Sequence, residues 1–225
     1  MPTTTRSRLS TISAKDIARL AKCGEEQLKQ EYDGASELYN RILRSSRNDI
    51  GSNEFIKLVY DMLIVFKMNS RGAKLSELPD FKKSIKEHTG TILSLAKYKL
   101  EKVKETDDAF KETISFLFDN LRLTQTTARL VTFSKTMHFL LPDLFMPIDR
   151  RYTLRFFYES TPVNQKQCFL QVFEQFRQYA QKHHEVLKEQ VDKNSRWNRN
   201  IPKIIDNIII ASITETMKPQ DKAKH

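Results

Sequence analysis

Apolar residues recur along this chain at the spacing of an α-helix. Between residues 55 and 66 they stand at i, i+3, i+4, i+7, i+8 and i+11, which places them on one face of a helix. Three further segments show the same helical spacing. We expect all four to bury one face in a core. The stripes are Phe55, Leu58, Val59, Met62, Leu63 and Phe66; Phe110, Ile114, Leu117 and Phe118; Phe169, Val172, Phe173 and Phe176; and Ile201, Ile204, Ile205 and Ile208.

Turn-forming residues separate the apolar segments and predict roughly eight to ten helices. Stretches of strand length that alternate apolar and polar residues between tight turns are missing, so we expect an all-α fold. Three helix starts carry a capping side chain: Ser52, Thr124, and either Thr106 or Asp107.

The composition is typical of a folded helical protein, with 39% hydrophobic and 29% charged residues and only 5 glycines. We expect residues 13–217 to form a single all-α domain, either one compact unit or two closely packed helical lobes. Residues 1–12 contain Arg6 and Arg8 among threonines and serines and are expected to form a flexible basic arm. Residues 218–225 are polar and are expected to form a flexible tail.

The charge balance points to an anionic partner. The net charge is +10 and the sequence pI is about 9.5, which favours DNA as the partner. An acidic protein or an anionic membrane surface is an alternative partner for this positive charge. The start of the sequence lacks the apolar core of a signal peptide, and no apolar run has the length of a membrane span, so we expect a soluble cytoplasmic protein. The oligomeric state does not follow from the sequence.

Metal and cofactor sites have little support in the sequence. Cys23 and Cys168 are too few for an iron–sulfur cluster, and no cysteines and histidines stand at metal-binding spacing. His183 and His184 are adjacent on a predicted helix and therefore point in different directions. We expect neither a metal nor a cofactor.

Residues 134–158 contain the densest group of candidate functional residues. Pro142 and Pro147 fix the backbone and remove two N–H donors, so the chain should leave a helix before Pro142 and run extended to Asp149. Asp149 then stands where a new helix would begin, as an N-cap favoured by the helix dipole. The arginines that follow on this helix are Arg150, Arg151 and Arg155.

Residues 126–157 resemble the second half of the helix-hairpin-helix motif, and the segment after it, in DNA glycosylases of the endonuclease III type. That pattern is a helix, a short loop with a proline, an apolar pair, an aspartate and a helix that starts with a basic or aromatic residue. The resemblance implies a helix-hairpin-helix glycosylase-like fold in which Asp149 is the catalytic carboxylate that stabilises an oxocarbenium-like sugar. The matching residues are Leu144, Phe145, Met146, Pro147, Ile148, Asp149, Arg150, Arg151 and Tyr152.

The chain departs from this family at two places. Bifunctional members have a lysine that would fall on Leu130 or Val131, so the resemblance implies a monofunctional enzyme. Lys135, one turn later, is the candidate replacement in the catalytic group, and a solvated or salt-bridged lysine is the alternative. The glycines of the family's hairpin are also missing, and the phosphate contact would come from the helix N-terminus with the hydroxyls of Thr126 and Thr127.

The chain also resembles a family of uncharacterised bacterial proteins in three motifs. These are MNSRGAKL at residues 68–75, SKxxHFLxPxLFxPxDRRYT at residues 134–153, and IPKxxDN at residues 201–207. This second resemblance spans more of the chain but implies no activity.

Other polar and aromatic residues each have a functional and a structural interpretation. His138 is a candidate catalytic residue in the pocket of Asp149, or a core histidine bonded to a carbonyl. Arg71 and Lys74 are candidate phosphate contacts, or belong to an ordinary helix end. Lys203 is a candidate nucleic-acid contact, or forms a local ion pair with Asp206.

Aromatic residues near arginines suit the binding of an exposed base. Arg196 and Arg199 flank the single tryptophan, Trp197, which stacks on a base or packs on the core. Phe145 and Tyr152 are candidates, with Trp197, for the wall of a pocket for a flipped base, although such aromatics are common in cores.

The sequence therefore predicts a DNA-binding protein of the helix-hairpin-helix glycosylase-like type that hydrolyses the N-glycosidic bond of a damaged or modified base. The alternative is a DNA-binding or protein-interaction module that keeps the fold without catalysis. Whether the chain is an enzyme stays open at this point.

Overall fold

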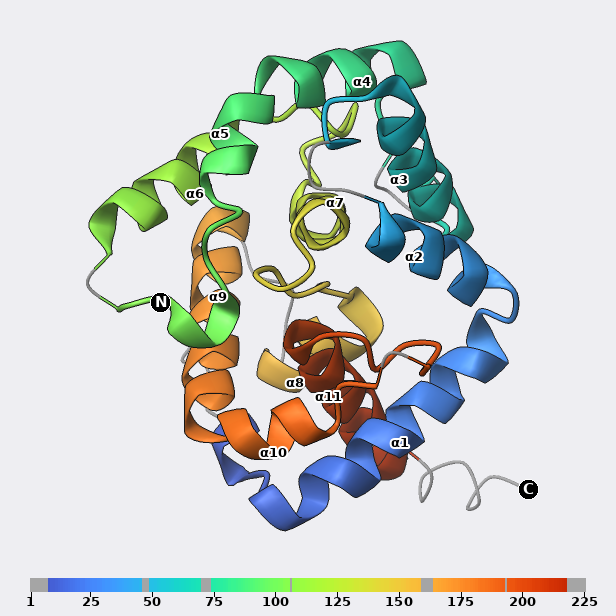
Figure 1. Ribbon diagram of the computed structural model, residues 1–225, viewed down its shortest axis with the longest axis vertical. Coiled ribbons are helices and arrows are strands. Elements are labelled where there is room, and N and C mark those ends of the chain that lie inside the picture. Colours follow the sequence, from blue (N-terminus) through green and yellow to red (C-terminus); the bar gives the residue numbers. More distant parts are fainter. Residues whose placement is uncertain are drawn as a thin grey trace.

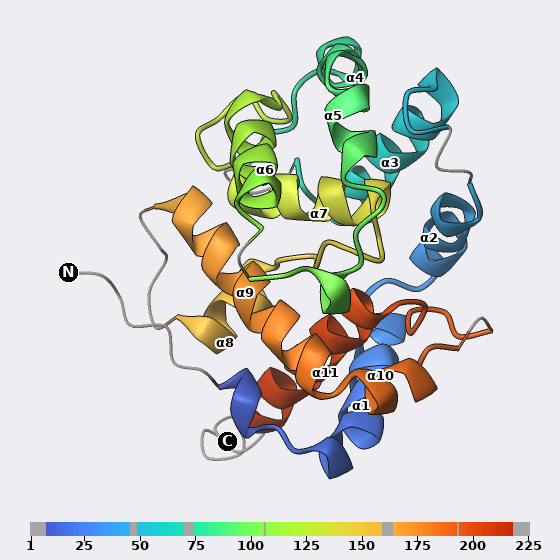
Figure 2. The same cartoon turned by 60° about the vertical axis from the view of Figure 1, so that its left-hand side comes forward.

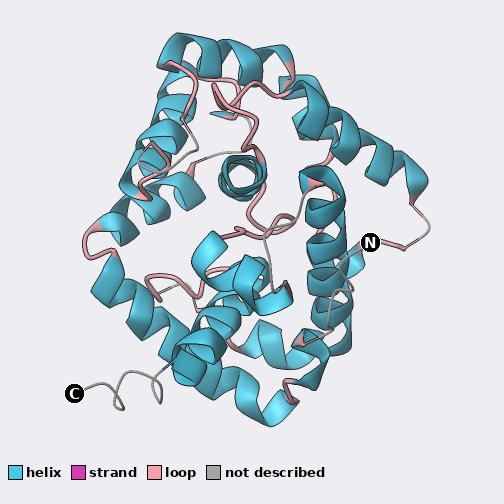
Figure 3. Ribbon diagram, turned by 180° about the vertical axis from the view of Figure 1, so that it is seen from behind, coloured by secondary structure: helices cyan, strands magenta, loops and turns pink. Residues whose placement is uncertain are grey.

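A computed structural model describes residues 8–45, 49–69, 74–105, 107–158, 164–192 and 194–217. Every regular element within these ranges is a helix, which confirms the all-α prediction (Figure 3). The described ranges contain eleven α-helices, one more than the upper end of the expected number. None of them is both long and apolar enough to form a membrane span.

The α-helices are α1 (Ala14–Glu31), α2 (Ala35–Arg44), α3 (Asn53–Val65), α4 (Leu78–Glu87), α5 (Thr89–Ser94), α6 (Asp108–Asn120), α7 (Leu130–Leu140), α8 (Arg155–Phe157), α9 (Gln165–Lys182), α10 (His184–Glu189) and α11 (Ile201–Met217). Two short 3₁₀-helices are η1 (Leu9–Thr11) and η3 (Leu100–Lys102), and η4 (Arg150–Leu154) is a π-helix. Leu9 of η1 is buried in the core, whereas residues 1–7 and 218–225 lie outside the described ranges.

The two ends of the described chain pack together. In Figure 1, α1, α8, α10 and α11 lie in the lower half, α2 to α6 lie in the upper half, and α9 runs along the side. Figure 2 shows the same division, with α7 at the edge of the upper half that faces the lower one. Helices α1 and α11 approach so closely that a Cβ added to Gly24 would lie 1.9 Å from the carbonyl oxygen of Asn207. Glycine at this position therefore permits the contact between the two helices.

The predicted stripes are buried in α3, α6, α9 and α11, except that Leu58 is half-buried and Phe66, directly after α3, is half-buried as well. Helix α11 differs from the prediction because its polar face is buried as well. Lys203, Asp206 and Asn207 are all buried, since α11 packs against α1, η4, α8, α9 and α10. The polar side of α11 therefore lies inside the molecule, where its charged groups must find partners.

Two of the three predicted caps are confirmed. Ser52 Oγ accepts from the N–H of Phe55 at 3.1 Å, and Asp107 Oδ1 accepts from the N–H of Phe110 at 2.9 Å.

The cap predicted at Thr124 is wrong, because α7 begins at Leu130 and Thr124 pairs with Leu75 in an isolated β-bridge. The side chain of Gln165 on α9 caps α7 instead, since its Oε1 accepts from the N–H groups of Arg129 and Leu130 at 2.8 and 3.0 Å.

Candidate functional site

A pocket lies where the two halves of the molecule meet, with walls from α1, α2, α7, η4, α11 and the loops beside them. Its cavity volume is about 40 Å³, and all the space between the lining atoms, with the open solvent at the mouth included, is about 480 Å³. Its aromatic walls are Tyr32, Tyr39, Phe66, Phe139, Tyr152 and Trp197, and its charged side chains are Lys135, Asp149, Lys203 and Asp206.

The mouth of the pocket is formed by Tyr32, Phe66 and Asp149, the three lining residues that keep part of their surface exposed. The rings of Tyr32 and Phe66 meet edge to face with centroids 4.9 Å apart. Tyr32 lies in the turn between α1 and α2, and Phe66 directly follows α3. Two neighbouring aromatic rings therefore border the entrance together with Asp149.

Asp149 occupies the position predicted for it, at the start of a helix after an extended segment. Its Oδ1 accepts from the N–H of Arg151 at 2.7 Å, and its own N–H donates to Thr153 Oγ1 at 3.2 Å. Ser134 Oγ on α7 accepts from the N–H of Ile148 at 2.9 Å, which ties the extended segment to α7. The helix that Asp149 caps begins as the π-helix η4. This form is rare in proteins, and where it occurs it is often at a functional site.

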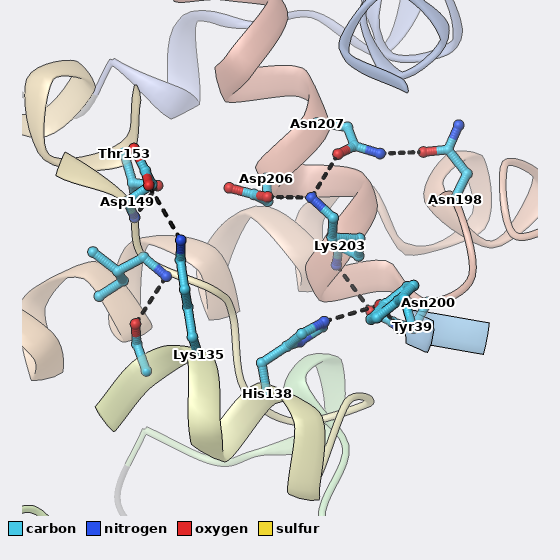
Figure 4. Close-up of polar contacts among 12 residues, drawn as sticks. Tyr39, Lys135, His138, Asp149, Thr153, Asn198, Asn200, Lys203, Asp206 and Asn207 are labelled. Atoms are coloured by element: carbon cyan, nitrogen blue, oxygen red, sulfur yellow. Dashed lines mark hydrogen bonds and ion pairs between the residues drawn. The ribbon is translucent and has the colours of Figure 1, made fainter. Parts of the chain in front are cut away.

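Lys135 and Asp149 form an ion pair inside the mouth, with Nζ 3.3 Å from Oδ2 (Figure 4). The lysine side chain is 7% exposed and lies over the Phe66 ring, whereas the aspartate side chain is 30% exposed. Burial alone would raise the pKa of Asp149, but Lys135 and the N–H groups of Arg151 and Tyr152 outweigh it and lower this pKa. The carboxylate is therefore ionised and accessible. Lys135 is therefore salt-bridged, which agrees with the structural interpretation given for it from the sequence.

His138 combines both of its interpretations, because it lines the pocket and is also a core histidine. Its Nδ1 lies 2.7 Å from the carbonyl oxygen of Phe145, so Nδ1 carries the proton and donates. Its Nε2 then accepts from the hydroxyl of Tyr39 at 2.9 Å, and that hydroxyl accepts from Asn200 Nδ2 at 3.1 Å. Burial lowers the pKa of His138 to about 3. A neutral histidine with both nitrogens engaged fixes the pocket wall and holds no proton that it can release near neutral pH.

Lys203 and Asp206 form the local ion pair that the sequence allowed, with Nζ 2.5 Å from Oδ2. Both side chains are only 6% exposed, so the lysine faces the pocket and not an outer surface on which a phosphate backbone would lie. Nζ also donates to Asn207 Oδ1 at 2.9 Å. Burial lowers the pKa of Lys203 and raises the pKa of Asp206, and their mutual attraction opposes both shifts.

A hydrogen-bonded loop brings Trp197 into the wall of the pocket. Glu25 on α1 accepts from Ser195 Oγ at 2.7 Å and from Asn198 Nδ2 at 3.0 Å. Trp197 is fully buried and stacks on Tyr39 with ring centroids 5.3 Å apart. Of its two interpretations, the packed position is the one that the structure supports, although the ring still lines the pocket.

Exposed arginines flank the mouth. Arg151 pairs with Glu31 at 3.0 Å, and Arg196 pairs with Asp33 at 3.6 Å. The two acidic residues directly precede and follow Tyr32 in the sequence. Arg150 and Arg155 are exposed on η4 and α8, next to Asp149 in the chain, and Arg199 is half-buried in the loop that carries Trp197. The tyrosine predicted for the pocket, Tyr152, lines it, and its hydroxyl donates to Glu31.

The remaining candidates do not line this pocket. Thr126 is half-buried and Thr127 is exposed, near the start of α7, where Gln165 already occupies the N–H groups that a phosphate would need. Lys74 is exposed beside the bridge to that segment, and Phe145 is fully buried against Phe169 and Phe173. Arg71 lies outside the described residues. Nor do the described residues contain a group of three histidine, cysteine or acidic side chains that could hold a metal.

Sequence reasoning missed the roles of Asp206, Tyr39 and Phe66 in the pocket. Phe66 was assigned to a core stripe, and nothing in its pattern distinguishes a pocket wall from a core. Asp206 did carry a signal, since Lys203, Asp206 and Asn207 stand at i, i+3 and i+4 on a helix otherwise rich in isoleucine. Three polar residues on one face of so apolar a helix indicate a buried polar site.

Comparison of the chain with models of known protein families, with curated protein sequences and with solved structures gives no match. The function must therefore be inferred from the geometry of the pocket and from the charges around it.

Proposed function

We propose that this protein binds DNA over the mouth of the pocket and hydrolyses the N-glycosidic bond of a damaged or modified base, with Asp149 as the catalytic carboxylate. A helix-hairpin-helix glycosylase-like fold is part of this proposal, supported by the aspartate that caps a helix at the junction of two helical halves. The protein would act as a monofunctional enzyme, in which water and not a lysine attacks the sugar.

One observation carries the proposal: an ionised, partly exposed carboxylate stands at the mouth of an aromatic pocket. The pKa of Asp149 is lowered by Lys135 and by backbone N–H groups, so the side chain is negative at neutral pH. As the bond from the sugar C1′ to the base breaks, positive charge grows on the sugar, and a carboxylate at that place stabilises it. The same carboxylate then accepts a proton from the attacking water.

Aromatic walls and exposed cations support the binding half of the proposal. A base turned out of a duplex needs a pocket with planar apolar walls, which Tyr32, Phe66 and Trp197 provide at its sides. Arg150 and Arg151, exposed beside Asp149, are placed to hold the phosphates of the strand that enters.

Lys135 acts in this proposal as a positioning residue. Its ammonium is paired with Asp149 at 3.3 Å and nearly buried, so it holds the carboxylate in its ionised form and orientation. A lysine in this state does not attack a sugar, because a Schiff base requires the neutral amine. Reduction with borohydride in the presence of abasic-site DNA should therefore trap no covalent complex.

The test of catalysis is base release from labelled duplexes that carry uracil, 8-oxoguanine, an alkylated purine or an abasic site. The wild type should release at least one of these bases, and Asp149→Asn should reduce the rate by about 100-fold or more while DNA binding persists. Asp119→Asn is the matched control, since Asp119 is an exposed aspartate that pairs with Lys166 and lies outside the pocket. Full activity of Asp149→Asn would remove the proposed catalytic role.

The test of binding is fluorescence anisotropy with labelled duplex and single-stranded DNA at several salt concentrations. Affinity should fall as salt rises, and Arg150→Gln should weaken binding and reduce the slope of log K against log salt by about 1. Lys57→Gln is the control, because Lys57 is an exposed lysine on α3 that pairs with Asp61 and does not line the pocket. Binding that does not depend on salt would contradict a phosphate interface.

A DNA-binding module without catalysis is the second candidate. The observation that favours it is the small cavity volume of about 40 Å³, which leaves room for roughly three water molecules. Salt-sensitive binding without release of any base would select this alternative. If neither binding nor release occurs, a protein-interaction module accounts for the basic surface.

A further inference from the structure

The pocket contains a second carboxylate, on its inner wall. Asp206 on α11 is buried and lines the same cavity as Asp149. Its Oδ2 is paired with Lys203, whereas no residue of the described chain forms a hydrogen bond with its Oδ1. In the view of Figure 4, Asp206 lies between Lys203 and the pair of Lys135 and Asp149. One oxygen of the carboxylate is therefore held in place while the other is left for a molecule in the pocket.

The surroundings of Lys203 fix this arrangement. Its ammonium donates to Asp206 and to Asn207, and Asn207 in turn donates to Asn198 Oδ1 at 2.7 Å. The N–H of Lys203 donates to Asn200 Oδ1 at 2.9 Å. Such a network keeps Lys203 within reach of Asp206, so the two side chains act as one unit that holds a transferable proton.

A second buried polar group also lacks a partner at this pocket. The indole N–H of Trp197 forms no hydrogen bond within the described residues, although the side chain is fully buried and lines the cavity. Buried donors are almost always paired in folded proteins, so an unpaired one requires an explanation.

The two aspartates of the pocket differ in their environment. Asp149 stands at the mouth beside backbone N–H groups, and its pKa is lowered. Asp206 is buried beside Lys203 on α11, and burial raises its pKa despite the attraction of Lys203. Two carboxyl groups whose pKa values are shifted in opposite directions suit two different roles, an ionised stabiliser and a proton donor.

We propose that Asp206, together with Lys203, is the general acid that protonates the departing base, while Asp149 stabilises the sugar. This inference rests on the proposed function and assigns its acid. As the bond between C1′ and the base nitrogen breaks, its electron pair stays on the base, which takes one proton from the pair of Asp206 and Lys203. Water then adds its oxygen to C1′ and gives a proton to Asp149, and exchange with solvent returns each carboxyl group to its starting state.

Leaving-group dependence tests this assignment. The first assay identifies a base that the wild type releases, and the second uses an analogue of that base with an electron-withdrawing substituent, which departs without protonation. Asp206→Asn should slow release of the parent base by about 100-fold or more and release of the analogue by less than about 10-fold. Asp149→Asn should slow both to the same extent, since both reactions develop the same charge on the sugar.

A second variant guards against loss of folding. Asp206→Asn leaves the Lys203 charge buried, so the double variant Lys203→Gln with Asp206→Asn, which has two neutral amides and no acidic proton, is measured beside it. Circular dichroism and thermal unfolding establish which variants are folded, and we expect at least the double variant to be folded. The folded variant should give the same selective loss with the parent base.

The outcomes separate the two proposals. Selective loss of the parent base in the folded variant supports Asp206 as the acid. Equal loss with both bases, or no loss with either, overturns the role of Asp206 and leaves the proposed function intact. A wild type that releases no base overturns the proposed function, and the acid role with it.

Discussion

Two lysine–aspartate pairs face the same pocket, and they are built in different ways. Lys135 and Asp149 come from two elements, α7 and the cap of η4, and the aspartate keeps 30% of its side chain exposed. Lys203 and Asp206 lie one turn apart on α11, and each side chain is only 6% exposed. The first pair is an ion pair at an entrance, and the second is a pair enclosed in the core.

The comparison shows how the environment gives one residue type two chemical roles. Backbone N–H groups and an exposed edge keep Asp149 ionised, whereas burial moves Asp206 toward the protonated form. A lysine partner is common to both and cannot account for the difference.

Removal of the inner lysine should have the largest effect. Lys203→Met leaves the Asp206 carboxyl group buried without its partner and should reduce the free energy of unfolding by about 3–5 kcal/mol. Urea unfolding at neutral pH measures this change. The double variant Lys203→Met with Asp206→Leu should recover most of the loss, because no unpaired charge remains. A loss below about 1 kcal/mol in the single variant would mean that the pair is not enclosed.

Helix α1 packs against α11, which carries the inner pair, and Gly24→Ala disturbs this contact directly. The added Cβ would lie 1.9 Å from the carbonyl oxygen of Asn207, whose side chain binds Lys203. Separation of the two helices should cost about 3 kcal/mol in thermal unfolding. Gly90→Ala is the matched control, since nothing lies within 4 Å of its added Cβ, and it should be neutral or slightly stabilising. Equal stability of the two variants would contradict the close approach.

His138 lines the pocket that both pairs face, and it should make the free energy of unfolding depend on pH. Its pKa in the folded protein is about 3, below its ordinary value of 6.5, so the unfolded chain binds a proton in this interval and the folded chain does not. Stability is then full above pH 6.5 and falls by about 1.4 kcal/mol per pH unit below it.

Urea unfolding at about pH 7 and about pH 5 measures this dependence, which should amount to about 2 kcal/mol. His138→Gln keeps an amide that can bond to Tyr39 and to the Phe145 carbonyl but removes the titrating ring. This variant should lose most of the dependence. An unchanged dependence in His138→Gln would assign it to other groups.

Removal of the outer lysine should have the smallest effect on stability. Lys135→Met leaves Asp149 with its backbone N–H donors and an exposed edge, so we expect a loss of about 1 kcal/mol. The pKa of Asp149 should rise in this variant, because an attractive charge is gone, and the acid limb of base release should move to higher pH. A loss as large as that of Lys203→Met would remove the distinction between the two pairs.

The sequence predicted the position of Asp149 and the local pair of Lys203 with Asp206, but not the pair of Lys135 with Asp149, for a physical reason. Asp149 follows two prolines and precedes a helix, so local backbone chemistry places it at a helix start. The sequence did not decide whether Lys135 is solvated or pairs with a carboxylate. Only the folding of residues 141–149 back onto α7 brings Asp149 within reach of it.

Features that depend on distant contacts were not predictable from local patterns. The start of α7 is set by Gln165, which lies more than thirty residues away and caps it from α9. The burial of the polar face of α11 depends on several neighbours that a single helical pattern does not contain. The isoleucine-rich pattern predicted the helix and its buried apolar face correctly, but it did not predict that Lys203 and Asp206 would be buried too.

The opposite shifts of the two aspartate pKa values in one pocket are tested most directly by a carbon-13 NMR titration of the aspartate carboxyl groups. Asp149→Asn and Asp206→Asn identify the two signals by their absence. The account predicts that Asp206 takes up its proton at a higher pH than Asp149, whose titration should lie below its ordinary pKa. Titration of the two groups at the same pH, or of Asp149 above Asp206, would contradict it.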